Sequence, residues 1–489
     1  PGTGARHGGQ ALEAPAEMDD YVRCLAPPRQ GEVLVQEDKD RNAAWRMPSA
    51  VYVQWMGALL AADRVHWRRV PCTVSEVRDL YWALHRDALP VRYRYMTTAE
   101  RWLRFRLNYM YMNLKAKCFT DGRGRTCAKA GHSCLRKVVS WRSHPAVDYY
   151  RWLARAVGAL AGARRKGFEV RSLKTAASEL RLRVASLEDN PHGCCRRCGR
   201  GMAGPAILVA DAAQMYEEVP PARVREGLQG LVTWARGRGY VGVVASRRSG
   251  GPSYLVRQGR RRPPGTEVFM WDEVTTGVDL ALAQGAVFVG DSVWRQAEGL
   301  PIGGPHSPAC CSVVLGADEA AWQDSEELRR SHGFGGGGSE LAKLAAFARY
   351  VDDLCMVSRV WCETCLEAML GAIYRKPVCF DKQATSAHGQ PWLDMWLSFS
   401  GGELEIHMDG QEQEWVASLG ACPPNKFRVQ PYLGDDVAGR ECLRQHVSSR
   451  MARFRQAGLQ GPLLEGAVER ELLVLAMHGY PRDLLREAW

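Results

Sequence analysis

Residues 347–358 read Phe347-Ala-Arg-Tyr-Val-Asp-Asp-Leu-Cys-Met-Val-Ser358, and this stretch decides the fold. Apolar, strand-like runs flank Asp352 and Asp353, which predicts two strands joined by a tight turn. Adjacent carboxylates at such a turn repel one another unless a cation lies between them. An Asx turn accounts for one aspartate but poorly for two that are flanked by β-forming residues. The pair therefore predicts a metal-binding site.

A third carboxylate follows another buried strand. The apolar run Ala206-Ile-Leu-Val-Ala210 predicts this strand, and Asp211 comes directly after it. If the strand pairs beside the hairpin, Asp211 joins Asp352 and Asp353 in a cluster that can hold two divalent ions about 3.5–4 Å apart. The predicted cofactors are two Mg²⁺ or Mn²⁺ ions. Such a site suits phosphoryl transfer, which needs mainly positioning and charge neutralisation.

Four stretches, in chain order, resemble motifs of reverse transcriptases. Leu135-Arg-Lys-Val-Val-Ser-Trp-Arg142 resembles the fingers strand whose arginine contacts the triphosphate. Asp211-Ala-Ala-Gln-Met-Tyr216 resembles motif A, and Leu300-Pro-Ile-Gly-Gly-Pro-His-Ser-Pro308 resembles motif B. Tyr350-Val-Asp-Asp-Leu354 resembles motif C. Each match alone is weak, whereas the ordered set is specific, and the resemblance covers roughly residues 118–430.

The resemblance implies an RNA-dependent DNA polymerase that adds dNTPs to the 3′-hydroxyl of a DNA primer on an RNA template. It implies an α+β, right-hand polymerase fold with fingers, an antiparallel-sheet palm and a helical thumb. We expect a basic, aromatic helical region at residues 1–117, fingers and palm at 118–430, and the thumb at 431–489. Within the first range, Trp102-Leu-Arg-Phe-Arg-Leu-Asn-Tyr-Met-Tyr111 is read as helical, either stacking on bases or forming an ordinary amphipathic face. Residues 118–145 predict a hairpin with a mobile tip.

The resemblance also implies roles for single residues. The metal ligands are Asp211, Asp352 and Asp353. Tyr216 would lie under the sugar of the incoming nucleotide and exclude a 2′-hydroxyl; the alternative is an ordinary core tyrosine. The remaining nucleotide contacts implied are Lys129, Arg136, Ala212 and Gly303. Lys382 would protonate pyrophosphate, or else it is a solvated surface lysine.

Among the subfamilies of reverse transcriptases, the chain most resembles those of Penelope-like elements. Residues 288–308 resemble their motif B region, Trp392-Leu-Asp-Met-Trp-Leu-Ser-Phe399 resembles a segment after motif D, and Gly479-Tyr-Pro481 resembles part of the thumb. Ile302 departs from the pattern, because retroviral enzymes have glutamine there. The sequence also carries no recognisable ribonuclease H, protease or GIY-YIG nuclease motif.

The chain has sixteen cysteines, several of them within apolar runs, as is typical of buried reduced thiols. A knuckle at 194–198 supplies candidate zinc ligands: Cys194, Cys195 and Cys198. Upstream residues that could complete this site are Cys118, Cys127, His132 and Cys134. Cys362 and Cys365 fall in a predicted helix, where we expect buried thiols and not ligands.

The net charge of +11 suits a polyanionic partner. The expected partners are an RNA template, a DNA primer, the RNA/DNA duplex and dNTPs. No apolar run is long enough to span a bilayer and no signal peptide is evident, so we expect no membrane partner. The cysteine usage favours an intracellular, reducing compartment, with nucleus and cytoplasm equally open.

Other functions stay open on the sequence alone. The chain could be a catalytically inactive or domesticated reverse-transcriptase-like protein that binds nucleic acid, although all three carboxylates are present. An RNA-dependent RNA polymerase is disfavoured by Tyr216 and by the Tyr-Val-Asp-Asp form of motif C. Telomerase-like function remains within the same class, but residues 1–117 contain no recognisable telomerase RNA-binding domain.

Overall fold

A computed structural model describes residues 30–36, 44–105, 107–114, 135–164, 168–170, 172–259, 263–334, 338–383, 389–393, 395–408, 437–456, 458–477, 480–481 and 483–485. The chain is α+β. It divides into two compact units. The first unit comprises Pro1–Leu160, Tyr216–Cys310 and Pro423–Arg428, and the second comprises Ala161–Met215, Cys311–Cys422 and Val429–Trp489. These units cross the boundaries expected at residues 117 and 430.

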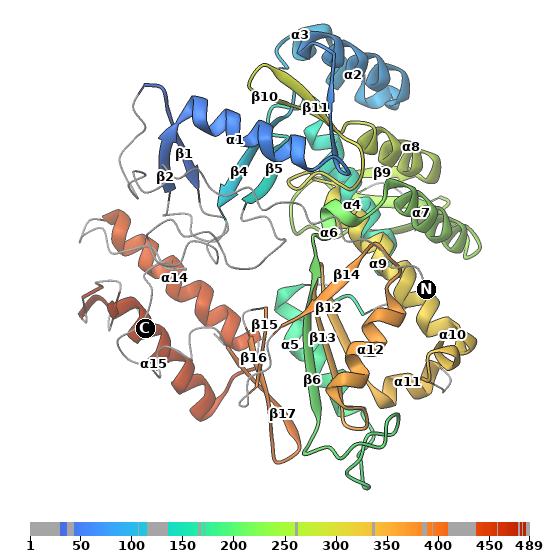
Figure 1. Cartoon of the computed structure of the whole chain (residues 1–489), viewed down its shortest axis with the longest axis vertical. Helices are drawn as coiled ribbons and strands as arrows, with labels where there is room; N and C mark the ends of the chain where they lie inside the picture. The colour runs from blue at the N-terminus through green and yellow to red at the C-terminus, as the bar shows by residue number, and fades with distance from the viewer. Residues whose placement is uncertain are drawn as a thin grey trace. The chain divides into compact units, whose positions relative to one another are not determined.

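The second unit is built on a four-stranded antiparallel sheet in the order β12-β13-β6-β14 (Figure 1). Its strands are β6 (Ala206–Ala213), β12 (Ala346–Tyr350), β13 (Asp353–Ser358) and β14 (Cys379–Lys382). The apolar run of β6 suits a strand that is covered on both faces. Leu208, Val209 and Ala210 are accordingly at most 1% exposed.

Two helices cover this sheet, α5 (Leu173–Ala185) and α12 (Glu363–Ile373). Small apolar side chains of α5, such as Ala177, share a buried cluster with Val209 and Cys355. At the other helix, Tyr374 directly follows α12, and its ring lies 4.4 Å from that of Phe380 in β14. Successive strand residues point to opposite faces, and Phe380 is the partner of Ala212, three residues after Val209. The two helices therefore cover opposite faces of the sheet.

Further elements of the second unit pack on the α5 side. The buried cluster of α5 also includes Trp392, Leu397 and Ile406 from a small sheet in the order β15-β16-β17, and Phe454 and Ala467 from two C-terminal helices. These elements are β15 (Gln390–Trp392), β16 (Met395–Ser400), β17 (Glu403–Met408), α14 (Val437–Gln456) and α15 (Gly461–Met477). Two shorter helices are α10 (Glu326–Ser331) and α11 (Gly338–Leu344). Helix α9 (Ser307–Asp324) begins in the first unit and ends in the second.

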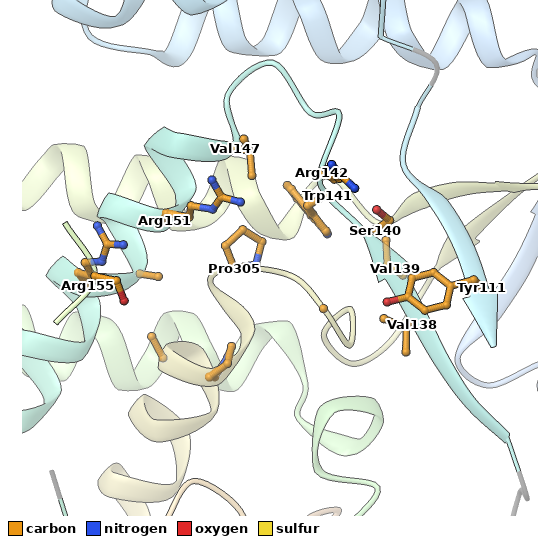
Figure 2. Close-up of a pocket in the computed structure, with 15 residues that line it drawn as sticks. Tyr111, Val138, Val139, Ser140, Trp141, Arg142, Val147, Arg151, Arg155 and Pro305 are labelled. Atoms are coloured by element: carbon orange, nitrogen blue, oxygen red, sulfur yellow. The ribbon is translucent and has the colours of Figure 1, made fainter. Parts of the chain in front are cut away.

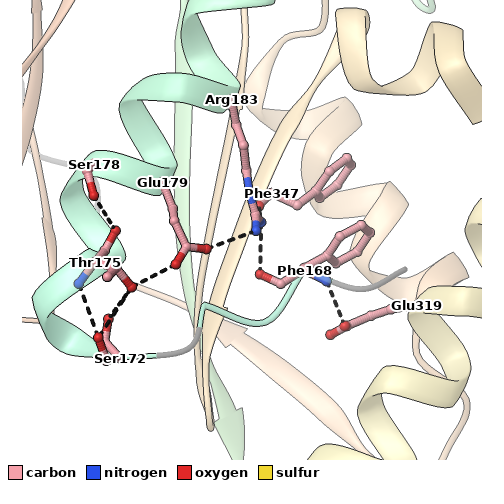
Figure 3. Close-up of polar contacts among 8 residues, drawn as sticks. All are labelled: Phe168, Ser172, Thr175, Ser178, Glu179, Arg183, Glu319 and Phe347. Atoms are coloured by element: carbon pink, nitrogen blue, oxygen red, sulfur yellow. Dashed lines mark hydrogen bonds and ion pairs between the residues drawn. The ribbon is translucent and has the colours of Figure 1, made fainter. Parts of the chain in front are cut away.

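Figure 3 shows the polar contacts that join α5 to β12. The guanidinium of Arg183 donates to the carbonyl oxygen of Phe168 at 3.0 Å and to that of Phe347. It also pairs with Glu179 one turn earlier on α5, at 3.4 Å. The rings of Phe168 and Phe347 stack with centroids 4.1 Å apart. The strand that leads into the aspartate turn thus has a fixed position on its supporting helix.

The first unit contains a five-stranded sheet in the order β3-β11-β10-β4-β5 and a three-stranded sheet in the order β8-β7-β9. The strands of the larger sheet are β3 (Trp67–Val70), β4 (Tyr109–Leu114), β5 (Leu135–Ser140), β10 (Ala286–Val289) and β11 (Ser292–Gln296). Those of the smaller sheet are β7 (Tyr240–Ser246), β8 (Tyr254–Arg257) and β9 (Thr266–Met270). A separate pair is formed by β1 (Glu32–Gln36) and β2 (Ala44–Pro48).

The helices that begin in the first unit are α1 (Ser49–Ala62), α2 (Val74–Ala88), the 3₁₀ helix η2 (Val91–Thr97), α3 (Ala99–Leu103), α4 (Val147–Ala163), α7 (Pro221–Arg236) and α8 (Trp271–Leu282). The short helix α6 (Met215–Glu218) spans the boundary between the units. Proline occupies the first position of α7, where its missing N–H costs no helical hydrogen bond. Among the described residues, no helix combines the length and the apolar character that crossing a bilayer requires.

One helix expected from the sequence is wrong. The stretch that begins at Trp102 leaves α3 after Leu103 and becomes strand β4. In β4, Met110 and Met112 are buried while Tyr109 and Tyr111 are exposed, which is the two-residue alternation of a strand. Leu107 has φ 69°, a value that a right-handed helix excludes.

The hairpin predicted at residues 118–145 is present in part. Its second strand is β5, but the strand paired with β5 is β4, which ends at Leu114 and therefore lies earlier in the chain than expected. Residues 115–134, between these two strands, lie outside the described residues, so the predicted tip is not tested.

Candidate active site

Three aspartates meet at one end of the four-stranded sheet. Asp353, the first residue of β13, is the cross-strand partner of Asp211 in β6. Directly opposite residues of an antiparallel pair point to the same face, with Cβ atoms typically ~4.5–5.5 Å apart. In the preceding turn, the carbonyl oxygen of Asp352 accepts a hydrogen bond from the N–H of Ala212 at 3.0 Å. The register thus places the three aspartates predicted from the sequence next to one another at this end of the sheet, each of them half-buried.

A fourth carboxylate lies on the other side of Asp211. Asp381 of β14 is also a cross-strand partner of Asp211, so its side chain points to the same face as those of Asp211 and Asp353. Sequence reasoning missed Asp381 because the pairing of β14 with β6 cannot be read from the short segment Phe380-Asp-Lys-Gln383. The carboxylates of three neighbouring strands therefore form one row across the sheet.

The backbone around this row is strained. Val351, in the turn between β12 and β13, has φ 57°. A β-branched side chain makes this left-handed region unfavourable. Gln214, three residues after Asp211, has φ 48°. Such conformations persist only where the surrounding structure holds them, and they cluster at functional sites.

Arg349 holds the strained turn from the interior of the second unit. Its guanidinium donates to the carbonyl oxygen of Val351 at 2.9 Å, and it forms an ion pair with Glu319 of α9 in which both side chains are fully buried. Glu319 also accepts hydrogen bonds from the hydroxyl of Tyr374 and the N–H of Phe168, each at 2.9 Å. Burial by itself lowers the pKa of Arg349, but the adjacent Glu319 more than offsets this and raises the pKa above its ordinary value. The guanidinium therefore stays charged.

The donor set of the carboxylate row fits hard divalent cations. Carboxylate oxygens are preferred ligands of Mg²⁺ and Mn²⁺ in proteins. Several like charges at one edge of a sheet are stabilised when a cation lies between them. Asp211, Asp352 and Asp353 are consequently suited to hold the two ions predicted from the sequence.

Lys382 lies on the opposite face of the same sheet. It is the partner of Ala210, and alternation along β14 directs it away from the side of Asp381. Its ammonium is 2.6 Å from the carboxylate of Glu363 in α12. The hydrogen bond to Glu363 raises the pKa of Lys382, which disfavours proton release. The structure does not bring Lys382 to the carboxylates.

In the first unit, two neighbouring cations of β5 have different environments. Arg136 is exposed, whereas Lys137 is buried and pairs with Asp63 at 2.5 Å and with Glu217 at 2.7 Å. Burial lowers the pKa of Lys137, but Glu217 and Asp63 outweigh it and leave the pKa raised. Lys137 therefore anchors the strand, and Arg136 is the exposed cation beside it. Lys129 lies outside the described residues.

A cleft of about 990 Å³ opens beside β5 within the first unit (Figure 2). Its wall includes Gly303 and Pro305 from the motif B segment and residues 138–142. Arginine side chains also line the cleft: Arg142, Arg151 and Arg155. The cleft thus combines apolar walls with positive charge.

Gly303 permits a close approach between the motif B segment and β5. It adopts φ 95°, and a Cβ atom there would lie 2.6 Å from the carbonyl oxygen of Val139. Next to it, the N–H of Val139 donates to the carbonyl oxygen of Ile302 at 2.7 Å. The sequence predicted an approach to the nucleotide at this glycine, whereas the described contact is to the β5 backbone.

Tyr216 is linked to the same motif B segment. Its carbonyl oxygen accepts the N–H of Leu300 at 2.5 Å, and a Cβ atom at Gly299 would lie 2.7 Å from that oxygen. The side chain of Tyr216 is half-buried, unlike the core tyrosines Tyr93 and Tyr149, which are at most 2% exposed. Tyr216 therefore differs from an ordinary core tyrosine of the first unit.

The structure groups the cysteines differently from the sequence prediction. The Sγ atoms of Cys195, Cys198, Cys362 and Cys365 all lie within 4.8 Å of one another, and Cys194 is outside this group. The sequence predicted Cys362 inside a helix, but Cys362 is the N-cap residue of α12. Cys365 lies in the first turn of this helix. The upstream candidates Cys118, Cys127, His132 and Cys134 lie outside the described residues.

Solved structures of polymerases are similar to this chain. Apo telomerase from Candida tropicalis aligns over 94% of this chain with a TM-score of 0.52 and 9% identity, and the chain spans 65% of that protein's length. Telomerase from Candida albicans, in complex with a TWJ fragment of telomeric RNA, aligns over 94% of this chain and 69% of its own, with a TM-score of 0.46 and 10% identity. The Sicinivirus 3Dpol RNA-dependent RNA polymerase covers 82% of this chain and 70% of its own, with a TM-score of 0.39 and 10% identity. In sequence, the chain matches no protein-family model and no curated protein. The likeness to the Candida tropicalis telomerase shows that the chain has a polymerase fold.

Proposed function

We propose that the chain is an RNA-dependent DNA polymerase of a retroelement, which extends a DNA primer on an RNA template. The register that pairs Asp353 with Asp211 carries this proposal, because it joins two distant sequence motifs into one carboxylate site beside Asp352. Carboxylates gathered in this way serve two-ion nucleotidyl transfer. The polymerase fold shared with a telomerase chain supports the same reading.

Each part of the site has a task in this proposal. When bound, the two divalent ions lower the pKa of the primer 3′-hydroxyl and neutralise charge on the departing pyrophosphate. Asp211, Asp352 and Asp353 hold these ions from the ends of packed strands. Arg349 keeps the turn in position through the carbonyl oxygen of Val351. The rigidity of this support matters because phosphoryl transfer depends mainly on positioning.

The larger parts of the polymerase follow from the same assignment. The four-stranded sheet is the palm, the β4–β5 pair belongs to the fingers, and α14 with α15 forms the thumb. Tyr216 contacts the sugar of the incoming nucleotide and excludes a 2′-hydroxyl. The other nucleotide contacts are Lys129, Arg136, Ala212 and Gly303. Because its ammonium is held by Glu363 on the opposite face of the sheet, Lys382 takes no part in the proposed step.

A Penelope-like origin is proposed from the segment that begins at Trp392. This side chain is fully buried, and its indole N–H donates to the carbonyl oxygen of Asp353 at 3.4 Å. The tryptophan of the resembling segment thus supports the backbone of a proposed metal ligand. Mapping of the gene's genomic copies tests the origin: dispersed copies with differing flanks are expected, and a single copy at one locus contradicts a mobile element.

Primer extension tests the polymerase activity. The template is poly(rA) with an oligo(dT) primer, and dTTP is compared with UTP in Mg²⁺ or Mn²⁺. We expect metal-dependent incorporation of dTTP, with UTP used far less. Preference for UTP would identify an RNA polymerase instead.

Binding measured in the same samples separates an inactive protein from an inactive preparation. The net charge of +11 predicts an affinity for the RNA/DNA duplex that falls steeply with salt. Tight, salt-sensitive duplex binding without extension in either metal would indicate a nucleic-acid-binding protein that has lost catalysis.

A further inference from the structure

The four clustered cysteines of the second unit have the geometry of a single-ion site. The Sγ atoms of Cys195 and Cys365 are 3.6 Å apart, and so are those of Cys198 and Cys362. Four thiolates around a tetrahedral zinc ion, with Zn–S bonds of about 2.3 Å, have neighbouring sulfur atoms roughly 3.8 Å apart. A disulfide requires about 2.05 Å, so the observed spacing matches metal ligation and not a bond between sulfurs.

The first two cysteines lie in a knuckle that the local backbone builds. The N–H of Gly199 donates to the carbonyl oxygen of Cys195 at 2.8 Å, and the N–H of Cys195 donates to that of Arg200 at 2.7 Å. Gly199 adopts φ 71°, a conformation that glycine reaches without strain. The chain therefore reverses within Cys195-Arg-Arg-Cys198-Gly199, and both sulfur atoms reach the cluster.

The other two cysteines lie at the start of α12. Cys362 is the N-cap residue, and its N–H donates to the Sγ of Cys195 at 3.4 Å. The N–H of Cys365 donates to the carbonyl oxygen of Cys362 at 3.0 Å. A helix N-terminus stabilises negative charge, and hydrogen bonds to sulfur favour the thiolate over the thiol. The start of α12 thus donates a backbone hydrogen bond to one sulfur atom of the cluster, that of Cys195.

The surroundings suit one ion that can enter from solvent. Cys195 and Cys365 are buried, Cys362 is half-buried and Cys198 is exposed. With all four sulfur atoms within 4.8 Å of one another, the space accommodates a single ion and not a polynuclear iron–sulfur cluster. Arg197, between the first two ligands, supplies positive charge near a site whose four thiolates exceed the charge of one divalent ion, whereas Arg196 is paired with Glu188.

We propose that Cys195, Cys198, Cys362 and Cys365 bind one structural Zn²⁺ ion. All four protein ligands are thiolates, and such closed sites stabilise folds and leave no open position for substrate. The inference concerns a different end of the sheet from the aspartates and does not rest on the polymerase proposal.

The ion would join the two loops that flank the β6–β13 pair. The knuckle precedes β6, and Cys362 follows β13, whose last residue Ser358 is paired with Ala206. The N–H of Arg196 already donates to the carbonyl oxygen of Val360 at 2.9 Å across the same gap. The end of the pair next to these loops, at Ser358, lies five residues from Asp353, roughly 17 Å at strand spacing.

This position gives the ion a definite task. A slip of one residue in strand pairing turns every side chain to the other face. By fixing the loops at one end, zinc would hold the register that sets Asp211 opposite Asp353 at the other end. The ion acts on the aspartates through strand pairing, without contact.

Metal content of the purified full chain tests the site without any activity assay. The protein is expressed with zinc in the medium, purified without chelators, and analysed by inductively coupled plasma mass spectrometry. We expect one zinc ion per chain and X-ray absorption that reports four sulfur neighbours at about 2.3 Å. Zinc-free protein, stoichiometric iron, or a disulfide that links any two of the four cysteines would overturn the assignment.

Matched variants locate the ligands. The double variant Cys198→Ser with Cys362→Ser removes one ligand from each loop and is expected to lose the zinc. Cys194→Ser changes the neighbour of a ligand, Cys379→Ser changes an exposed cysteine of β14, and both should keep one ion per chain. Zinc retained in the double variant, or lost in Cys194→Ser, contradicts the proposed ligand set. A failure of primer extension would leave the zinc content unchanged. The zinc proposal and the polymerase proposal can therefore be contradicted independently.

Discussion

The two ends of the β6–β13 pair carry different kinds of site. At one end, Asp211 faces Asp353 next to a turn whose sequence alone predicted a metal site. At the other end, Cys195 and Cys362 meet although they are 167 residues apart in the chain. Adjacent aspartates are conspicuous because they are costly without a partner, whereas paired cysteines have an ordinary role as buried thiols. A site can be predicted from the sequence when its residues would destabilise the fold if they bound no partner.

The largest effect is expected at the aspartate end. Asp211→Asn or Asp352→Asn should lower kcat/KM for primer extension by at least ~10³-fold, about 4 kcal/mol of lost transition-state stabilisation, because a metal ligand loses its charge. Duplex affinity, measured by fluorescence anisotropy, should change little. Asp272→Asn is the control, since Asp272 is an exposed residue of the first unit paired with Arg236. Extension near the wild-type rate in either site variant contradicts the two-ion assignment.

The next effect concerns the buried support of the same turn. Arg349→Met leaves Glu319 buried without its partner, and breaking such a pair typically costs about 3–5 kcal/mol. Urea unfolding measures this loss. Adding Glu319→Gln should recover part of it, because the uncompensated charge disappears. The control is Arg225→Met, whose ion pair with Asp279 is half exposed on both sides and should cost less than about 1 kcal/mol. Equal losses in Arg349→Met and Arg225→Met would show that the buried pair has no special part in holding the turn.

A smaller effect is expected at Tyr216, and it tests whether the resemblance to motif A also holds in the first unit. Tyr216→Ala should admit ribonucleotides, since removal of a ring that leaves no room for a 2′-oxygen relieves an overlap of about 1–3 kcal/mol. This corresponds to roughly a ten- to hundredfold change in the ratio of kcat/KM for dTTP to that for UTP. Tyr216→Phe is the matched control and should keep the ratio. An unchanged ratio in Tyr216→Ala would make Tyr216 a structural residue and the motif A register wrong.

The smallest effect is expected at the strained turn. Val351→Gly removes the penalty of the left-handed conformation, about 1–2 kcal/mol for an L-residue, but adds about 0.5–1 kcal/mol of chain entropy. The variant should therefore be as stable as the wild type or up to about 1.5 kcal/mol more stable. Val351→Ala keeps the Cβ atom, which also disfavours this conformation, and should bring a smaller gain than Val351→Gly. A clear loss of stability in Val351→Gly would mean that the valine side chain, and not the backbone, sets the energetics of the turn.

Local patterns predicted part of the fold and the centre of the site. The aspartate hairpin and the strand before Asp211 are present because their apolar runs specify strands directly. Helix α7 begins where its prolines indicate. The helix predicted around Trp102 failed, since aromatic and basic residues suit a helix and an alternating strand almost equally well.

Pairings between distant segments explain the remaining differences between the sequence prediction and the structure. Asp381 joins the carboxylate row only because β14 lies beside β6, and the same pairing turns Lys382 to the opposite face. Cys362 joins the cysteine group because α12 begins one residue after it. A helix boundary is uncertain by one or two residues from sequence alone, which is enough to hide a ligand.

The central place of β6 has a consequence during synthesis. Both strands that flank β6 lie more than a hundred residues later in the chain, so at ordinary translation rates β6 leaves the ribosome on the order of ten seconds before either strand exists. During this interval the uncharged run Ala206-Ile-Leu-Val-Ala210 has two open edges, which is the condition under which strands of separate chains join. The yield of soluble protein should therefore depend on how crowded the nascent chains are, and it should rise when expression is slowed or a chaperone that covers apolar strands is supplied.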